Sequence, residues 1–361
     1  MTSSTLQKFR QQFDQQLPFV LYRKPNGNHV IGLLQRNQEL YTITNFEEKG
    51  FVFAPFDGDK LVLIPQNQCE IAMMPFEVLE LTQNELPTPE ISDAVAKEQH
   101  IQLVEKAIQQ INQGDCSKIV ISRKETLPLV DFDLFVGFQK LAQLYPSAFA
   151  YCLYHPKVGL WLGAFSESLL YVNELEFRTM AVAGTQVYDE NAIAIWGNKE
   201  MEEQKLVTDF LVSKLEDLSA ELHISKPYDL KAGQLIHLKS DIHGTFKTGT
   251  DLRKLLSILH PTPAVCGFPK EVAKSFILQN EGYDRRYYSG FLGEFNIDFQ
   301  SNENATDLFV NLRCVQIETD EMSNTHTAHI YVGGGITAQS NPGSEWLETV
   351  NKATTIKKVL L

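Results

Sequence analysis

The sequence predicts an α+β fold built on antiparallel sheets, and three observations indicate it. The chain has 361 residues, of which 43% are hydrophobic and 21% are charged, so it has ordinary globular composition and enough length for a large core. Segments with strand character arrive in consecutive groups and do not alternate one-for-one with helices, which disfavours a doubly wound parallel sheet. No stretch approaches the roughly 18 uninterrupted apolar residues of a membrane-spanning helix.

The residues before the first long helix predict mostly short strands separated by turn chemistry such as Pro25–Asn28. The expected strands are Phe19–Tyr22, His29–Leu34 and Gly50–Ala54. We expect Leu86–Glu90 to connect them to a first helix, Ser92–Gln113, because apolar residues recur there close to helical spacing and Gly114 ends the pattern.

The rest of the chain predicts two further groups of strands with helices between them. The first group comprises Lys118–Arg123, Phe149–Tyr154, Gly159–Gly163, Leu169–Val172 and Glu176–Ala183. Helices are expected at Asn198–Leu222 and Leu252–Leu259. The last group comprises Ser289–Phe295, Asp307–Gln316 and His329–Val332, and a terminal helix follows at Ser344–Leu360.

The overall charge excludes two classes of partner. Acidic residues number 45 and basic residues 32, which gives a net charge of −13. Such a chain repels nucleic-acid phosphate and anionic lipid, so we expect neither as a main partner. The five cysteines are scattered with no C-x-x-C pair, which favours a reducing compartment, and the N-terminus has no apolar signal core. A cytoplasmic protein is therefore expected.

Two acidic pairs at helical spacing are the strongest candidates for chemistry. Glu200 and Glu203 stand three residues apart on one expected helix, and Glu345 and Glu348 repeat that spacing on the terminal helix. If the helices face each other, the four carboxylates converge and require a divalent cation. Carboxylate oxygens suit Mg²⁺, which keeps positions open for water or an anionic substrate. The alternative is a pair of solvated helix faces.

Lys118 is a candidate general base. Strand alternation places it on the same face as Val120 and Ser122. If that face is buried, the neutral amine is favoured and the lysine pKa falls, so that the amine can accept a proton at neutral pH. The alternative is a lysine at a strand edge with its ammonium in water.

Glu167 is a candidate general acid. It lies in the turn Phe165–Glu167, directly after the apolar run Val158–Ala164. A carboxyl group beside a buried strand end is expected to have a raised pKa, as a general acid needs. The alternative is a solvated turn residue. Lys118 and Glu167 form a complementary pair only if they flank one pocket.

Several other residues could bind an anionic substrate. The triplet Gly333–Gly335 follows an expected strand and could present backbone N–H groups to a carboxylate or phosphate, although a tight turn is the alternative. Its spacing matches neither a Walker loop nor a dinucleotide fingerprint. Arg313 and Lys352 are candidate anion clamps, with surface ion pairs as the alternative. His237 and His260 could bind substrate or could be structural.

Read together and in order, these segments resemble the chorismate-utilising enzyme family, which includes isochorismate synthases, salicylate synthases, anthranilate synthase large subunits and aminodeoxychorismate synthases. The resemblance covers Glu98 to Leu361, and Ser340–Thr349 comes close to a family signature. The matching segments are Ser117–Arg123, Gly163–Leu169, Ala183–Thr185, Lys199–Val207, His260–Pro269, Tyr288–Gly290, Leu312–Cys314, Gly333–Ile336 and Ser340–Thr349.

The resemblance implies one large domain of two packed antiparallel sheets with helices on the outside. Residues 98–361 would form the chorismate-binding catalytic region, and residues 1–97 would be a strand-rich part of the same domain. Glu203 and Glu348 would hold Mg²⁺, with Glu200 and Glu345 beside them, and the metal would grip the ring carboxylate of chorismate.

The resemblance also assigns the rest of the pocket. Arg313 and Tyr288 would meet the pyruvyl carboxylate of chorismate. The remaining lining residues would be Gly184, Thr185, His237, Gly333 and Lys352.

Two positions favour water as the nucleophile. Family members that add water carry a lysine where this chain has Lys118, whereas anthranilate synthases generally lack that base and use ammonia. Aminodeoxychorismate synthases place a nucleophilic lysine where this chain has Ala183. The resemblance therefore implies an isomerase, a Mg²⁺-dependent isochorismate synthase. In it, Lys118 deprotonates water for attack at C2 while Glu167 protonates the departing C4 hydroxyl.

Salicylate synthase is the first alternative, because these enzymes go on to eliminate pyruvate in the same pocket. They tend to carry threonine where this chain has Ala264, so the alanine favours stopping at isochorismate. An anthranilate synthase large subunit is less favoured. The product would feed menaquinone or siderophore synthesis, and the expected state is a monomer or weak homodimer whose only substrate partner is chorismate.

Overall fold

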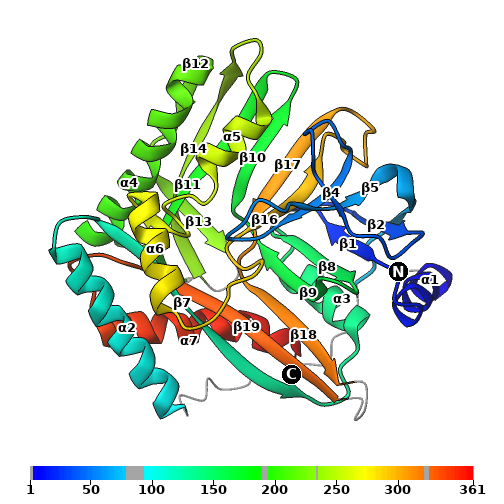
Figure 1. Cartoon of the computed structure of the whole chain (residues 1–361), viewed down its shortest axis with the longest axis horizontal. Helices are drawn as coiled ribbons and strands as arrows, with labels where there is room; N and C mark the ends of the chain where they lie inside the picture. Colours follow the sequence, from blue (N-terminus) through cyan, green and yellow to red (C-terminus); the bar gives the residue numbers. More distant parts are fainter. Residues whose placement is uncertain (1–2, 79–92, 189–193, 233–234, 321–324, 361) are drawn as a thin grey trace.

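The computed structural model describes residues 3–78, 93–188, 194–232, 235–320 and 325–360, and two large antiparallel sheets dominate this part of the chain. In spatial order, sheet A contains β15 (Gly267–Phe268), β7 (Lys118–Leu129), β19 (Thr325–Ile336), β18 (Cys314–Asp320), β9 (Gly159–Phe165), β8 (Phe149–His155), β1 (Phe19–Arg23), β2 (His29–Gln35) and β6 (Cys69–Pro75). The consecutive groups of strands in the sequence thus form antiparallel neighbours, as predicted (Figure 1).

Sheet B is built in the same antiparallel way. In spatial order it contains β12 (Ser219–Ile224), β14 (Leu235–Phe246), β11 (Glu176–Val187), β10 (Ser168–Asn173), β17 (Ala305–Val310), β16 (Phe291–Phe295), β4 (Gly50–Ala54), β5 (Val62–Pro65) and β3 (Tyr41–Thr42). A short strand, β13 (Tyr228–Ala232), also pairs with β14. Residues before the first long helix supply strands to both sheets.

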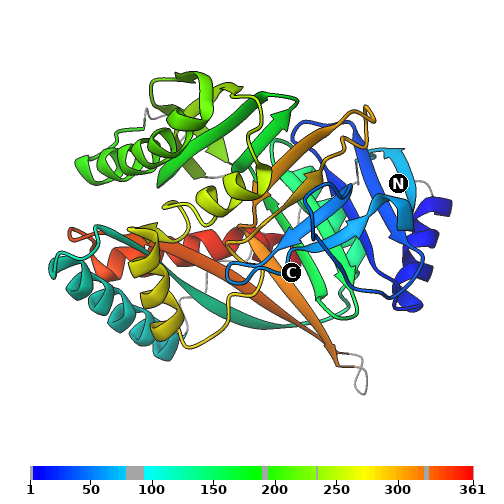
Figure 2. The same cartoon turned by 45° about the horizontal axis from the view of Figure 1, so that its top comes forward.

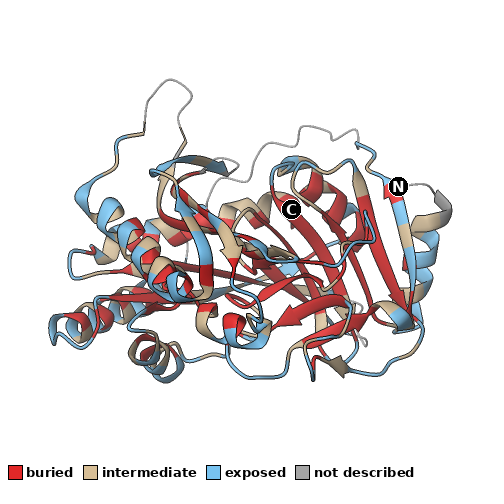
Figure 3. Ribbon diagram, turned by 90° about the horizontal axis from the view of Figure 1, so that it is seen from above, coloured by how far each residue is buried: buried red, intermediate tan, exposed pale blue. Residues whose placement is uncertain are grey.

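Aromatic side chains fill the space between the two sheets. Tyr22 and Phe149 of sheet A and Phe51 of sheet B are fully buried, and the ring centroids of Tyr22 and Phe51 lie 5.1 Å apart across the interface. Trp161 and Phe53 make a similar contact at 5.9 Å. Such rings bury large apolar areas, so this layer joins the two sheets into one core (Figure 3).

Helices cover the outer faces of the sheets, as the family resemblance implied. Their bounds are α1 (Ser3–Asp14), α2 (Ala94–Asn112), α3 (Leu134–Leu144), α4 (Asn198–Leu215), α5 (Leu252–Leu259), α6 (Lys270–Asn280) and α7 (Pro342–Leu360). Sheet A packs against α1, α3 and α7, and sheet B packs against α4 and α5, while α2 and α6 flank β7. Consequently α4 (green) and α7 (red) belong to different layers of the molecule (Figure 2).

The expected helix Asn198–Leu222 is too long. It ends at Leu215, a short 3₁₀ turn follows over Glu216–Leu218, and Ser219–Ile224 forms β12 beside β14. The Ser219 hydroxyl donates to the Leu215 carbonyl at 2.7 Å and so satisfies one of the open carbonyls at the helix end. Pairing with a long neighbouring strand outweighs the local helical pattern.

The expected strand Asp307–Gln316 is wrong in a way that matters for function. The segment forms two strands in different sheets, β17 in sheet B and β18 in sheet A, and the chain crosses between them at residues 311–313. Arg313 has a φ of 44°, a left-handed conformation that its sequence neighbours do not predict. The crossover places Arg313 at the junction of the two sheets.

Two other expectations need correction, and some elements had not been expected. The triplet Gly333–Gly335 lies inside β19 and pairs with β7, so it neither follows a strand nor forms a tight turn. The strand expected at Ser289–Phe295 begins only at Phe291, because Ser289 adopts a positive φ of 61°. The elements that had not been predicted are α1, α3, α6, β3, β5, β6, β13, β14 and β15.

Some expectations stay open or concern simple features. The connector Leu86–Glu90 lies outside the described residues, and the division near residue 97 stays a prediction. No helix in the described ranges is long and apolar enough to cross a membrane. All five cysteines are buried and unpaired.

Candidate active site

A pocket opens where the two sheets meet, with walls from β7, β9, β11, β14, β19, α4 and α7. It offers a cavity of about 150 Å³. Most of the residues singled out in the sequence line it, namely Glu167, Gly184, Thr185, Glu200, Glu203, His237, Ala264, Tyr288, Arg313, Gly333, Glu348 and Lys352. Lys118 and Glu345 lie directly behind this lining, because each contacts a residue that forms it.

Glu167 sits between β9 and β10, at the point where the chain leaves sheet A for sheet B. Its carbonyl accepts a hydrogen bond from the Val310 backbone at 2.9 Å, which holds the turn against β17. Burial raises the pKa of the Glu167 carboxyl to about 7, although Lys118, Arg313 and Lys352 partly oppose the shift. The direction is the one expected, and the carboxyl can hold a proton near neutral pH.

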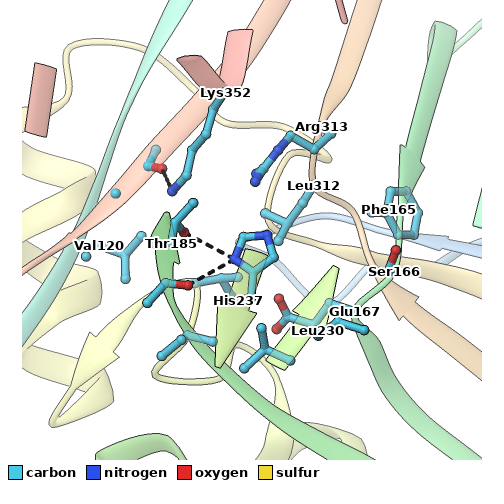
Figure 4. A pocket seen from close by; sticks show the side chains of 18 of the residues that line it. Val120, Phe165, Ser166, Glu167, Thr185, Leu230, His237, Leu312, Arg313 and Lys352 are labelled. Atoms are coloured by element: carbon cyan, nitrogen blue, oxygen red, sulfur yellow. Dashed lines mark hydrogen bonds between the residues drawn. The ribbon is translucent and has the colours of Figure 1, made fainter. Parts of the chain in front are cut away.

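Two cationic side chains face Glu167 across the pocket. Figure 4 shows the Arg313 guanidinium and the Lys352 ammonium pointing into the same space as His237. No hydrogen bond or ion pair to another described residue occupies the Arg313 guanidinium, which leaves it available for a carboxylate. Lys352 is tied back more firmly, because its ammonium donates to the Gly333 carbonyl at 2.8 Å.

His237 is held in one orientation by β11. Its Nδ1 lies 3.0 Å from the Gly184 carbonyl and 3.2 Å from the Thr185 hydroxyl. Because a carbonyl oxygen only accepts, Nδ1 carries the proton and Nε2 offers a lone pair. Burial and the charge of Arg313 lower the pKa of His237 to about 3, so the ring is neutral at physiological pH. His237 is therefore a hydrogen-bond acceptor in the pocket.

The glycine triplet of β19 allows the opposite wall to approach closely. A Cβ on Gly335 would lie 2.3 Å from Glu203 Oε1 and 2.8 Å from Lys118 Cε. A Cβ on Gly333 would lie 2.8 Å from the Tyr288 hydroxyl. Side chains at these positions would displace the pocket residues, so glycine serves close packing here.

Glu200, Glu203 and Glu348 line the pocket and Glu345 lies behind it, but lysines hold three of these four glutamates. Each pair has a nitrogen–oxygen distance of 2.6 Å, and the pairs are Lys118–Glu203, Lys199–Glu345 and Lys352–Glu348. The fourth carboxylate, Glu200, accepts from the Gly197 backbone at 3.0 Å and so caps the start of α4. Glu345 is buried and the other three glutamates are partly buried, so these are not fully solvated helix faces.

Lys118 is buried, and it has a partner that the sequence did not predict. Its side chain is only 1% exposed, so it does not lie at a strand edge with its ammonium in water. Its partner is the Glu203 carboxylate, whose Oε1 lies 2.6 Å from Lys118 Nζ. The sequence also missed Lys199, the partner of Glu345, although it directly precedes Glu200.

The donor set of the converging glutamates suits a hard cation. Glu345 Oε2 is buried without a hydrogen-bond partner, and it lies 3.5 Å from an ideal Cβ at Gly334, with Glu348 Oε1 at 3.9 Å from the same point. No group of three or more metal-ligating side chains in the described ranges is arranged as a metal centre, since lysines occupy the carboxylates. All-oxygen donors around a glycine strand nevertheless fit Mg²⁺.

The two carboxylates of α7 differ in their ionisation. Burial raises the pKa of Glu345, and Lys199 offsets this shift only in part. Burial acts in the same direction on Glu348, but Lys352 and Lys199 outweigh it and lower its pKa. Glu348 is therefore the more firmly anionic of the two, as a metal ligand should be.

Comparison with known proteins gives a consistent result. A family model described as chorismate binding enzyme matches residues 63–361. The isochorismate synthase MenF of Pasteurella multocida is 28% identical over 340 residues, which cover 91% of this chain and 74% of that protein. The isochorismate synthase EntC of Escherichia coli is 28% identical over 273 residues, 72% of this chain and 66% of that protein.

One further relative and two solved structures extend the comparison. The salicylate biosynthesis isochorismate synthase of Pseudomonas aeruginosa is 28% identical over 266 residues. These residues cover 71% of this chain and 53% of that protein. The structure of Escherichia coli MenF superposes with a TM-score of 0.75 at 20% identity and covers 95% of this chain and 89% of that one. The structure of anthranilate synthase component I of Streptococcus pneumoniae superposes with a TM-score of 0.65, also at 20% identity. It covers 94% of this chain and 92% of that one. At such identities the structures establish the fold alone.

Proposed function

The chain belongs to the chorismate-binding enzyme family, and from this premise we propose that it is an isochorismate synthase. The reaction is an isomerisation of chorismate in which water adds at C2 and the C4 hydroxyl leaves. One observation carries the proposal more than any other: a carboxyl group with a pKa of about 7, Glu167, shares a pocket with two carboxylate-binding cations, Arg313 and Lys352.

The proposed acid–base pair consists of Lys118 and Glu167. Lys118 takes a proton from water while the water oxygen forms a bond to C2. The double bonds shift, the C4–oxygen bond breaks, and Glu167 gives its proton to the departing hydroxyl, which leaves as water. A carboxyl that holds its proton near pH 7 supports the second role.

Substrate orientation follows from the cations and from His237. Arg313 and Tyr288 bind the pyruvyl carboxylate, since no described residue occupies the guanidinium and the tyrosine lines the same pocket. The bare Nε2 of His237 accepts a hydrogen bond from a hydroxyl, either of the substrate or of the attacking water. Gly184, Thr185, Gly333 and Lys352 complete the pocket.

A magnesium ion fits beside α4 and α7. Glu203 and Glu348 would hold it, with Glu200 and Glu345 next to them, and the buried, unpartnered Oε2 of Glu345 supports a cation here. When bound, Mg²⁺ neutralises the ring carboxylate of chorismate and fixes that end of the substrate. The five buried, unpaired cysteines support a reducing compartment such as the cytoplasm.

The runner-up is a salicylate synthase, which would add pyruvate elimination to the same reaction. Ala264 lines the pocket where such enzymes tend to carry threonine, which supports the isomerase. Anthranilate synthase is disfavoured by Lys118, a buried base suited to water. The choice between menaquinone and siderophore synthesis depends on which enzyme consumes the product.

Product analysis tests the proposal directly. The purified protein is incubated with chorismate and MgCl₂, and the products are separated by chromatography. Isochorismate as the only product is expected. Salicylate with pyruvate would favour the runner-up, and a requirement for ammonium with anthranilate as product would favour anthranilate synthase. Calorimetric binding of chorismate without turnover would reduce the protein to a metabolite-binding module.

A further inference from the structure

Arg285 is a buried cation that does not line the pocket yet contacts its walls. It follows α6, and its side chain is 3% exposed. Its guanidinium binds the Glu281 carboxylate through two hydrogen bonds of 2.8 and 2.5 Å. The Glu281 carboxylate is equally buried, so the two ends form a closed ion pair in the interior. Nothing in the proposed reaction uses either charge.

The remaining donors of Arg285 reach two neighbouring segments of the pocket wall, which a backbone hydrogen bond from Val120 to Cys266 at 2.8 Å also joins. Nη2 donates to the Val120 carbonyl at 2.7 Å, and Nη1 donates to the Val265 carbonyl at 3.1 Å. Val120 belongs to β7, two residues after Lys118, whereas Val265 follows Ala264 in the irregular segment before β15. Both line the pocket. One planar group therefore spans the strand of the proposed base and the segment of Ala264.

Glu281 strengthens the link to β7. Its Oε1 accepts from the Ser122 backbone at 2.7 Å and from the Ser122 hydroxyl at 2.9 Å. The Ser122 hydroxyl also lies 2.6 Å from the Tyr283 hydroxyl. The β7 strand is thus held at alternate residues along the edge that faces β15, at the Val120 carbonyl by Arg285 and at the Ser122 N–H by Glu281.

Two aromatic rings fix the plane of the guanidinium. Phe56 lies 4.4 Å from it and Tyr288, a pocket residue, lies 5.8 Å from it. The Arg285 carbonyl also accepts from the Tyr288 backbone at 2.9 Å. Such a planar fork with fixed donors suits arginine, since a lysine ammonium offers a point charge that cannot span two carbonyls and a carboxylate at once.

We propose that Arg285 is a positioning residue, which together with Glu281 extends the backbone pairing between β7 and residues 266–268 to the Ala264–Val265 wall and so keeps Lys118 aligned with the bound ring. This inference rests on the proposed function. A buried ion pair is weak evidence for stability, and here its hydrogen bonds to Val120, Val265 and Ser122 constrain the backbone instead. A displacement of about 1 Å at a reacting centre can cost on the order of 100-fold in rate, so the spacing matters for turnover.

The test compares Arg285→Lys with Arg286→Lys, a matched change at the exposed neighbouring arginine. We expect Arg285→Lys to lower kcat by about 10- to 100-fold, while Arg286→Lys stays near the wild-type value. The Mg²⁺ affinity and stoichiometry, measured by calorimetry with MgCl₂ alone, should be unchanged, because neither hydrogen bonds nor ion pairs join Arg285 to the helical glutamates among the described residues. Hydrogen exchange should accelerate in a peptide covering residues 260–267.

The outcomes separate positioning from a merely structural role. If kcat per Mg²⁺-binding site equals that of Arg286→Lys, or if exchange at 260–267 is unchanged, the inference is wrong. If Arg285→Lys does not fold, Glu281→Gln provides the same comparison, because the amide oxygen can still accept while the charge is lost. If the wild-type protein leaves chorismate unchanged, the proposed function is wrong. The hydrogen-exchange measurement would still test whether Arg285 holds residues 260–267 in place.

Discussion

Two carboxyl groups of the pocket, Glu167 and Glu348, are the same chemical group with opposite behaviour. Burial favours the protonated form of both. Glu348 has the Lys352 ammonium at 2.6 Å, and its pKa falls below the ordinary range. Glu167 has cations in the pocket but none in contact, and its pKa rises to about 7. Between these two carboxyls, the contacting Lys352 ammonium outweighs burial at Glu348, whereas burial outweighs the more distant cations at Glu167.

The largest expected effect comes from removing the acid. Glu167→Gln keeps the shape of the side chain but cannot transfer a proton, so kcat should fall by about 10² to 10⁴-fold. Steady-state isochorismate formation measures it. Mg²⁺ binding should be unchanged, and Glu174→Gln, at an exposed site after β10, is the matched control. Near-normal turnover of Glu167→Gln would contradict the assigned acid.

The base should be almost as sensitive. Lys118→Ala removes the only proposed proton acceptor for water, and we expect a similar loss in kcat of about 10² to 10⁴-fold. Lys124→Ala, an exposed lysine on the same strand, controls for changes in charge. Circular dichroism checks that β7 is intact. Wild-type rates in a folded Lys118→Ala protein would show that another group accepts the proton.

The role of Glu348 as a metal ligand can be tested by measuring Mg²⁺ binding. Glu348→Gln should weaken Mg²⁺ binding by about 10- to 100-fold, because a neutral amide replaces a carboxylate donor. Titration calorimetry with MgCl₂ measures the affinity without substrate. Glu202→Gln, at an exposed position on α4, should bind Mg²⁺ like the wild type. If both variants bind Mg²⁺ with equal affinity, Glu348 is not a ligand and the cation binds at another site.

The pH dependence sharpens the contrast. Glu167 has its proton up to about pH 7 in the folded protein, against an ordinary value of 4.5, so kcat should fall about tenfold per pH unit above 7. The raised pKa of Glu167 also contributes to the free energy of unfolding. This contribution is fully present below pH 4.5 and is lost as the pH rises through 7. A rate profile that stays flat to pH 9 would remove Glu167 as the acid.

The smallest expected effect concerns the product. Ala264→Thr places a hydroxyl in the pocket wall, as in salicylate synthases, and we expect pyruvate to appear as a minor product beside isochorismate. A lactate dehydrogenase-coupled assay detects it. Thr262→Ala, two residues earlier in the same segment, is a control for disturbance of the backbone. Pyruvate release by both variants would indicate general loosening of the segment.

Much of the site could be predicted because its residues lie in short, ordered motifs. The spacing of Glu345 and Glu348 on one helix, the alternation that places Lys118 inside, and the turn carrying Glu167 are all local patterns. The structure brings them to one pocket. The ion pairs between these glutamates and lysines were not predicted. Lys118 and Glu203, for example, are 85 positions apart in the sequence, and local spacing does not indicate a contact over that distance.

The sequence by itself determined the fold class, the consecutive antiparallel strands and the acidic helix faces, because hydrophobic periodicity and i,i+3 spacing depend on near neighbours only. Tertiary structure alone decided that Arg313 stands at a crossover between sheets, that the glycines of β19 serve close packing, and that lysines hold three glutamates. Those features arise where distant segments meet in a low-dielectric interior, and there the identity of the contacting group sets both conformation and charge.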